Sequence, residues 1–152
     1  ITAPVFVARQ LIKHQIGLVW NEVSRRYVDT EPEFWEPDVW RGKAKNKKQG
    51  SELEGVSSQD VMMHVYQDAL RHAEDAYNYL LQSGVCPEQA RSVLPQSLIT
   101  QWYWSGSLAA FARVCNLRNK PDAQIETQLI AKEIDNHMSN LYPTSWSALC
   151  GT

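Results

Sequence analysis

The apolar positions at the start of the chain recur at helical spacing after Pro4, a residue that suits the first turn of a helix because its missing N–H is not needed there. They predict a helix from Val5 to Gln15, which Gly17 ends. From Leu18 to Val28 the apolar residues again recur at helical spacing, but they are β-branched or aromatic. We therefore expect this stretch to be irregular to extended.

Longer helical patterns follow farther along the chain. One runs from Ser57 to Gln82, with an acidic residue in its capping sequence, and stops at Gly84. A short helix is expected from Pro87 to Leu94, another helix from Gly106 to Leu117, and a last long helix from Pro121 to Pro143. The predicted inward-facing residues of the three long helices are Val61, Val65, Ala69, Ala73, Ala76, Tyr77, Leu80 and Leu81; Leu108, Phe111, Val114 and Cys115; and Ile125, Leu129, Ile130, Ile134 and Met138.

Strand signals are fewer. The run from Leu98 to Trp104 is predicted to be a buried strand. The stretch from Asp29 to Gly55 has the least regular pattern and is rich in proline and glycine, but Trp35 and Trp40 indicate that its first half packs on other residues. Helices dominate, and the predicted fold class is α+β, a single domain of helices packed on a small, mostly antiparallel sheet.

The composition is that of an ordinary globular protein. The 152 residues suffice for one domain with a sizeable core, and hydrophobic residues make up 43% and charged residues 21% of the chain. A net charge of −2 gives no overall attraction to nucleic acid or to acidic lipid. Six Trp and six Tyr favour a large core, an aromatic-lined ligand site, or both.

The cysteines and histidines show no metal-binding pattern. Cys86, Cys115 and Cys150 are odd in number and widely spaced, so neither a disulfide framework nor a metal site is expected. His64 and His72 lie eight residues apart on a predicted helix, too far for a helical metal pair. The sequence has no apolar run of about 18 residues and no signal-peptide pattern, so a reduced, cytoplasmic protein is the simplest interpretation.

One segment concentrates polar chemistry. Between Arg9 and Tyr27, cationic side chains, amides and a hydroxyl lie among apolar residues, as a phosphate-bearing, hydrogen-bonding ligand requires. An amphipathic helix with a solvated polar face, followed by an edge strand, is the simpler interpretation, and composition alone favours it. The basic run from Lys43 to Lys48 also has two interpretations, phosphate contacts or, more simply, a solvated loop tip.

The first of three motif blocks lies in this polar segment. It consists of Lys13-His14-Gln15, eight further residues, Ser24, and the pair Arg26-Tyr27. It resembles the signature of the flavin-dependent thymidylate synthases, which is arginine-histidine-arginine, a spacer one residue shorter, serine, and an arginine-tyrosine pair.

Two further blocks resemble that family in the same order along the chain. The run from Ala90 to Pro95 is similar to its alanine-arginine…leucine-proline element. Asn116-Leu117-Arg118, with Ala123-Gln124 and Glu126 downstream, is similar to its leucine-arginine…alanine-glutamine…glutamate element. The resemblance covers nearly the whole chain, and the loop with Trp40-Arg41 and Lys48-Gln49-Gly50-Ser51 looks like versions carried by bacterial viruses, which would place the protein in a host cytoplasm.

The resemblance implies an α+β fold and a homotetramer whose sites form where subunits meet. The implied reaction makes dTMP from dUMP, with methylenetetrahydrofolate supplying the carbon and FAD, reduced by NADPH, supplying the hydride. Nucleic acid and membranes are not expected partners. Because the chain opens on Ile1, we expect residues 1–152 to form the synthase domain without the family's N-terminal segment, which supplies further FAD contacts.

The resemblance also implies site roles, residue by residue. Arg118 matches the catalytic arginine, whose guanidinium would favour the ionised pyrimidine by facing its N3 and O4 edge; the alternative is a cation that offsets a helix dipole. Ser24 is not expected to be a nucleophile, because no histidine–acid pair is placed to activate it. The expected dUMP contacts are Gln10, Lys13, Glu22, Ser24, Arg25, Arg26, Arg91 and Arg118. The expected FAD contacts are Lys13, His14, Gln15, Glu22, Ser107 and Arg113.

Several positions depart from the family pattern. Lys13 keeps the charge of an arginine but loses its planar fork, and Gln15 keeps hydrogen bonding but loses the charge. Ala109 falls where a flavin-binding arginine is common, and Asp122 where histidine is usual. Because reduced flavin is anionic near neutral pH, these changes are expected to weaken FAD binding. The extra spacer residue is expected within Ile16 to Val19. It would change the direction in which the side chains of Lys13-His14-Gln15 point.

Two other functions stay open. A homologue that binds dUMP but has lost flavin chemistry would account for Gln15, Ala109 and Asp122. A single-strand nucleic-acid binder would stack bases on Trp and Tyr beside the basic run from Lys43 to Lys48, although the balanced charge argues against it.

Overall fold

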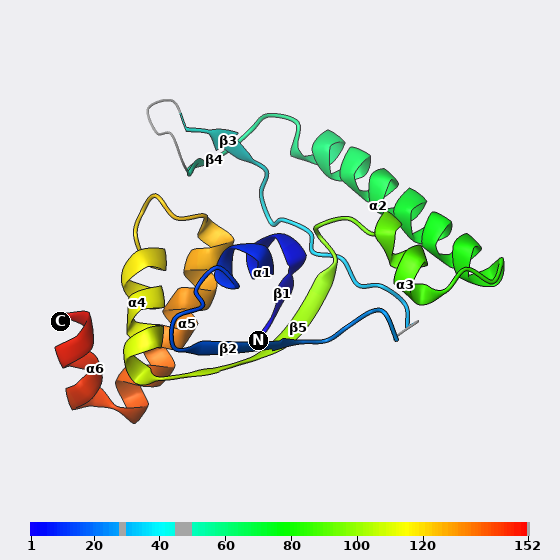
Figure 1. Cartoon of the computed structure of the whole chain (residues 1–152). Coiled ribbons are helices and arrows are strands. Elements are labelled where there is room, and N and C mark those ends of the chain that lie inside the picture. Colours follow the sequence, from blue (N-terminus) through cyan, green and yellow to red (C-terminus); the bar gives the residue numbers. More distant parts are fainter. Residues whose placement is uncertain (28–29, 45–49, 152) are drawn as a thin grey trace. The chain divides into compact units, whose positions relative to one another are not determined.

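The computed structural model describes residues 1–27, 30–44 and 50–151 (Figure 1). In these residues the chain forms α-helices, one 3₁₀ turn and short strands. In chain order they are β1 (Thr2–Pro4), α1 (Val5–Leu11), β2 (Leu18–Glu22), β3 (Arg41–Lys43), β4 (Ser51–Gly55), α2 (Gln59–Gln82), α3 (Pro87–Ala90), the 3₁₀ turn η1 (Arg91–Val93), β5 (Ile99–Gly106), α4 (Leu108–Arg118), α5 (Ile125–Leu141) and α6 (Pro143–Cys150).

The strands form two small sheets, one in the order β1-β5-β2 and the other of β3 with β4. In the first, β1 pairs antiparallel with the start of β5, with Thr2 opposite Gln101 and Pro4 opposite Ile99. The predicted α+β class, with helices and small antiparallel sheets, is therefore confirmed.

The chain divides into two compact units, each assembled from segments that are separate in the sequence. The first unit contains Ile1–Ala8, Glu22–Trp40 and Gly55–Trp102; the second contains Arg9–Asn21, Arg41–Glu54 and Tyr103–Thr152.

Aromatic contacts organise the first unit. Phe6 and Trp35 meet edge to face with ring centroids 5.1 Å apart, and Trp40 and Tyr66 meet in the same way at 5.1 Å. The hydroxyl of Tyr66 donates to the carbonyl oxygen of Trp35 at 2.6 Å. The prediction that Trp35 and Trp40 pack the irregular stretch onto other residues is confirmed.

The predicted inward stripe of α2 is partly wrong. Tyr77 is fully buried as predicted, but Val61 and Val65 are 57% and 62% exposed. The face of α2 that packs in its unit carries Tyr66, Leu70 and Tyr77, which recur four and seven residues apart. That face is rotated by one residue from the valine stripe, so the valines point outward.

In the second unit, α4, α5 and α6 pack against one another (Figure 1, yellow to red). Their core contains Phe111, Ala112, Cys115 and Trp146. The indole of Trp104 from β5 meets Phe111 edge to face at 5.4 Å and also meets Trp20 from β2 at 5.5 Å. The inward face predicted for residues 106–117 is confirmed.

Pro143 was expected to end the last long helix, and α5 does end just before it, at Leu141. Pro143 then opens a further helix, α6, since proline is tolerated in the first turn of a helix. Two other predictions fail, one in α5 and one in β5. Leu129 is 56% exposed, because α5 instead buries Thr127 and Ala131. The strand β5 is not buried on both faces: Trp102 is 2% exposed but Tyr103 is 82% exposed, as the alternation of a sheet with one covered face requires.

A close approach of two glycines fixes the path from α1 to β2. Gly17 has φ +74°, in the left-handed region that favours glycine. A Cβ on Gly106 would lie 2.4 Å from the Gly17 carbonyl oxygen and 2.6 Å from Leu18 Cδ2. The two backbones can meet here only because Gly106 has no side chain.

Replacing Gly106 by Ala is therefore expected to lower the free energy of unfolding by about 1–3 kcal/mol, as overpacking does. Urea denaturation followed by circular dichroism would measure it. Gly42→Ala is the matched control, because its Cβ would meet its nearest neighbour at 3.6 Å, an ordinary contact. An equal loss in both variants would contradict the importance of the close approach.

Candidate functional site

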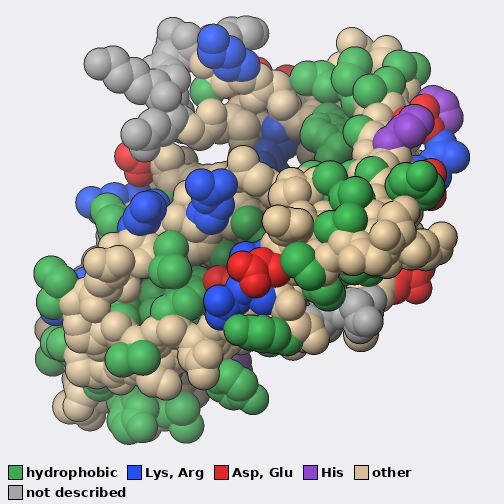
Figure 2. Space-filling model, turned by 45° about the vertical axis from the view of Figure 1, so that its right-hand side comes forward, with side chains coloured by type: hydrophobic (Ala, Val, Ile, Leu, Met, Phe, Trp, Pro, Cys, Tyr) green, Lys and Arg blue, Asp and Glu red, His purple; other side chains and the backbone are tan. Residues whose placement is uncertain are grey.

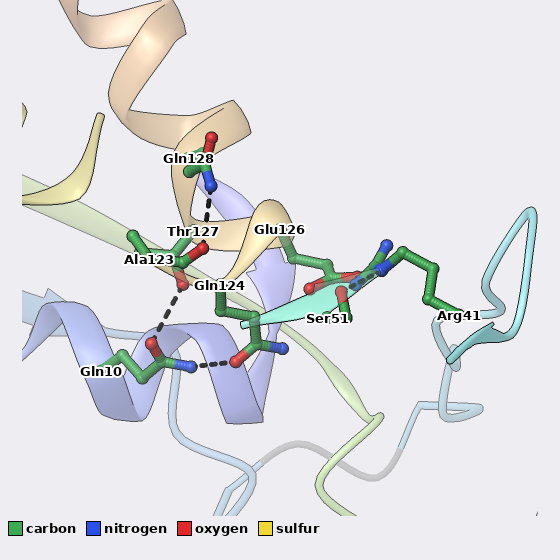
Figure 3. Close-up of polar contacts among 8 residues, drawn as sticks. All are labelled: Gln10, Arg41, Ser51, Ala123, Gln124, Glu126, Thr127 and Gln128. Atoms are coloured by element: carbon green, nitrogen blue, oxygen red, sulfur yellow. Dashed lines mark hydrogen bonds and ion pairs between the residues drawn. The ribbon is translucent and has the colours of Figure 1, made fainter. Parts of the chain in front are cut away.

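A cavity of about 540 Å³ lies in the second unit. Its walls come from the end of α1, the β3–β4 sheet, the end of α4 and the turn that precedes α5. Figure 3 shows several of the lining side chains and their polar contacts. The lining residues are Gln10, Arg41, Gly50, Ser51, Arg118, Asp122, Ala123 and Gln124.

Neutral hydrogen bonds join Gln10 to the start of α5 (Figure 3). Gln10 Nε2 donates to Gln124 Oε1, and Thr127 Oγ1 donates to Gln10 Oε1 at 3.3 Å, so both ends of the Gln10 amide are fixed. Thr127 is fully buried. Gln128 Nε2 donates to the carbonyl oxygen of Ala123 at 2.8 Å and closes the turn before the helix.

Arg118, the last residue of α4, is held from two sides. Its Nε donates to His14 Nε2 at 2.9 Å, and its Nη2 donates to the carbonyl oxygen of Gln10 at 3.2 Å. Burial, and then the charge of Arg118, lower the pKa of His14 below its ordinary value of 6.5. The second unit thus brings together three predicted site residues, with the guanidinium fixed at the cavity wall.

A second guanidinium reaches the cavity from the β3–β4 sheet. Arg41 Nε donates to Ser51 Oγ at 2.8 Å, and Arg41 Nη2 pairs with Glu126 Oε1 at 2.5 Å (Figure 3). The side chains of Arg41 and Glu126 are 23% and 9% exposed. Burial by itself raises the pKa of the Glu126 carboxyl, but hydrogen bonds from Arg41, from its own backbone N–H and from Gln124 hold that pKa below 4.5. The carboxyl is therefore ionised near neutral pH.

The loop between α1 and β2 is tied to α4. Arg113 Nη2 donates to the carbonyl oxygen of Ile16 at 2.7 Å, and the Ser107 backbone N–H donates to the carbonyl oxygen of Gly17 at 3.2 Å. The side chains of Lys13 and Gln15 are exposed and make no hydrogen bond or ion pair with any residue that the structure describes. They are free to meet a ligand, whereas Arg113 and Ser107 already hold the loop.

The remaining predicted site residues lie in the first unit. Arg26 Nε donates to Ser24 Oγ at 3.1 Å, which places these two side chains together. Arg25 Nη1 donates to the carbonyl oxygen of Thr30 at 2.7 Å. Glu22 Oε1 accepts from Thr100 Oγ1 at 2.7 Å, and Arg91 Nε donates to the carbonyl oxygen of Glu88 at 3.3 Å on a separate turn.

The side of the cavity that the β3–β4 sheet forms was not predicted from the sequence. Arg41 and Ser51 were noted only as parts of a loop, and Gln124 and Glu126 only as parts of a motif. Since Arg41 and Glu126 are 85 residues apart, no local pattern joins them. Of the basic run, Lys43 is exposed, and the lysines at 45, 47 and 48 lie outside the described residues.

The cysteines are unpaired thiols. Burial, with Asp135 and Cys150 nearby, raises the pKa of the Cys115 thiol to about 12, so it remains protonated and unreactive. Within residues 1–27, 30–44 and 50–151, no group of three or more His, Cys, Asp or Glu could hold a metal ion. No helix in this part of the chain has the length and apolarity needed to cross a membrane.

Comparison with known proteins gives a family. Residues 1–144 match the family described as thymidylate synthase complementing protein. The chain belongs to this family. Members with the name flavin-dependent thymidylate synthase include one from Thermus thermophilus, 37% identical over 148 residues, and one from Thermosipho africanus, 33% identical over 149 residues. Each alignment covers 97% of this chain, and the chain spans 54% and 65% of the length of these two relatives.

Solved structures with the same fold include a methylase of pyrimidine nucleotides. The UMP/dUMP methylase PolB from Streptomyces cacaoi, bound with 5-Br dUMP, is 25% identical with a TM-score of 0.87. The match covers 99% of this chain and 68% of that one. Its structure with 5-Br UMP gives 26% identity, a TM-score of 0.88, and coverage of 99% and 71%.

Proposed function

We propose that the chain catalyses the reductive methylation of dUMP to dTMP, with methylenetetrahydrofolate as carbon donor and FAD, reduced by NADPH, as hydride source. Family membership and the names of the relatives support the reaction class. The observation that carries the proposal is the fixed guanidinium of Arg118 at the wall of a polar cavity of about 540 Å³.

Arg118 is the proposed catalytic residue. Uracil becomes nucleophilic at C5 only when negative charge builds on N3 and O4. A guanidinium that is already oriented stabilises that charge without reorganising during the reaction. The hydrogen bonds to His14 and to the Gln10 carbonyl supply this orientation, and Arg118 lines the cavity where a ring would lie.

The other proposed dUMP contacts follow the family resemblance. Gln10 has a fixed amide at the cavity wall. Ser24 and Arg26 lie together in the first unit and supply a hydroxyl and a planar cation suited to a phosphate. The proposed set is completed by Lys13, Glu22, Arg25 and Arg91. We also propose the homotetramer, in which such sites would be built from residues of several subunits.

Ser24 is proposed to bind and not to react. Replacing it by Ala removes one hydrogen-bonding group and is expected to weaken dUMP binding about fivefold, the effect of roughly 1 kcal/mol, while dTMP formation continues. Isothermal titration with dUMP and a product assay would measure the two effects. Ser139→Ala, an exposed serine on α5, is the control. Complete loss of product in Ser24→Ala would contradict a binding role.

The residues around the loop fit a flavin only in part. Lys13 and Gln15 are exposed donors beside His14, available to an anionic cofactor. Ser107 and Arg113 are the further proposed contacts, although each already bonds to the loop backbone. A bound reduced flavin supplies two electrons as hydride. Asp122, which stands where the family pattern has histidine, adds a carboxylate in place of a possible cation, so weak FAD binding is expected.

The test begins with the visible absorption spectrum of the purified protein, before and after FAD is added. dTMP formation is then measured by chromatography with dUMP, methylenetetrahydrofolate, NADPH and FAD, and UMP replaces dUMP in a parallel reaction because the structural neighbour is a UMP/dUMP methylase. The proposal expects FAD-dependent dTMP. A protein that takes up no FAD and forms no dTMP contradicts it.

A second candidate is a dUMP-binding homologue that has lost flavin chemistry. It is motivated by Asp122 and Ala109, which stand where the family pattern has histidine and a flavin-binding arginine. Isothermal titration that detects dUMP binding and no FAD binding would support this candidate. FAD-dependent dTMP formation would exclude it.

A further inference from the structure

The hydrogen bond between Arg118 and His14 defines the state of the histidine. A guanidinium Nε always carries hydrogen and can only donate, so His14 Nε2 must be the acceptor in the 2.9 Å contact. An imidazole that accepts at Nε2 carries its proton at Nδ1 and is neutral. His14 is half-buried, which also disfavours the charged form.

The position of His14 is built into the fold of the second unit. The His14 backbone N–H donates to the carbonyl oxygen of Leu11 at 3.0 Å and turns the chain at the end of α1. Two residues later, Arg113 holds the carbonyl oxygen of Ile16, and Ser107 holds that of Gly17. Ser107, which caps α4, and Arg113 and Arg118, from its middle and end, thus hold three points of one loop.

We infer that His14 is a positioning residue for Arg118: neutral His14 fixes the guanidinium, and protonated His14 releases it. The inference rests on the proposed function, in which Arg118 faces the uracil ring. It differs from the expectation that His14 contacts the flavin directly, because here the histidine acts on the substrate side through the arginine.

The charges around His14 determine how its contact with Arg118 changes with pH. The charged group that acts on His14 is Arg118, from α4. Lys13 precedes His14 in the loop. Arg118 and Lys13 are both cations. Protonation of His14 therefore removes the only acceptor nitrogen of the ring from Arg118 Nε and adds a like charge next to it. Because the pKa of His14 is lowered from 6.5, this change occurs below pH 6.5.

The first experiment observes the contact itself. Nitrogen-15 NMR of the imidazoles in the labelled protein is expected to show His14 in the Nδ1–H tautomer, with a midpoint below pH 6.5 that rises in Arg118→Gln. A His14 that carries its proton on Nε2, or that titrates at or above pH 6.5, overturns the inference.

The second experiment measures turnover of dUMP against pH. His14→Ala is expected to lower kcat about 10-fold to 100-fold, with KM for dUMP changed less than threefold, because misplacing a catalytic group slows the chemical step. His14→Gln, whose amide oxygen can accept from Arg118 without titrating, is expected to recover part of kcat and to lose the fall in rate that wild type shows below pH 6.5.

His137→Gln is the control, since His137 is exposed on α5 and should keep the wild-type pH profile. The positioning role is wrong if the rate of His14→Gln still falls below pH 6.5 as that of wild type does. It is also wrong if His14→Ala changes FAD retention and not kcat. If wild type itself forms no dTMP at any pH, the proposed function fails, and the NMR result then decides the contact alone.

Discussion

Replacing Arg118 by Ala is expected to lower kcat for dTMP formation by about 10²–10³-fold, the usual effect of removing one oriented donor from a site of developing charge. The loss should appear in kcat more than in FAD retention, because the guanidinium is proposed to face the pyrimidine. Single-turnover kinetics with dUMP, read by product chromatography, would measure it, and the visible spectrum of the same sample would report flavin.

Two variants make that result specific. Arg118→Lys keeps the positive charge but not the planar fork that reaches both His14 and the Gln10 carbonyl, so it should recover little of the lost rate. Arg71→Ala removes an exposed arginine that pairs with Asp68 on α2, and it should leave kcat unchanged. A normal rate in Arg118→Ala would exclude Arg118 from the chemistry.

The largest effect on stability is expected at the ion pair between Arg41 and Glu126. Glu126→Ala leaves the mostly buried guanidinium without its carboxylate, and removing one partner of such a pair typically costs about 3–5 kcal/mol. Urea denaturation of wild type, Glu126→Ala, Arg41→Ala and the double variant would give the coupling free energy between the two side chains. Glu133→Ala, an exposed glutamate on the same helix, should change stability by less than about 0.5 kcal/mol.

The same pair gives a pH dependence with a definite sign. The folded pKa of Glu126 lies below its ordinary value of 4.5, so the unfolded chain takes up the proton first as the pH falls. The contribution of the pair is complete above about pH 4.5 and is lost as the pH falls through the lower folded value. The stability difference between wild type and Glu126→Ala should shrink in that window; a difference that is constant down to pH 3 would contradict the ion pair.

The sequence predicted the elements whose signals are local. The end of α2 near Gly84 and the run of α4 up to Arg118 were placed within about two residues, because glycine stops and helical spacing act over a single turn. The three residues of β3 and the five of β4 were missed, since strands this short inside a proline- and glycine-rich stretch carry no readable alternation.

In the candidate site, too, the sequence predicts individual residues but not the contacts between distant ones. Gln10, His14 and Arg118 are predicted as site residues by the family resemblance, and the structure brings them together in one unit. Their mutual bonds were not predictable, because Arg118 and His14 are 104 residues apart. Arg41 was not found as a cavity residue, because its partner Glu126 is set by the packing of the β3–β4 sheet on α5 and not by spacing.

The cavity has two walls that respond differently to acid. Gln10, Gln124 and Thr127 join α1 to α5 through amides and a hydroxyl, none of which titrates between pH 2 and 10. The wall from the β3–β4 sheet depends instead on one carboxylate, that of Glu126. Acidification below about pH 4.5 should therefore weaken the Arg41–Glu126 contact, while the hydrogen bonds among Gln10, Gln124 and Thr127 persist.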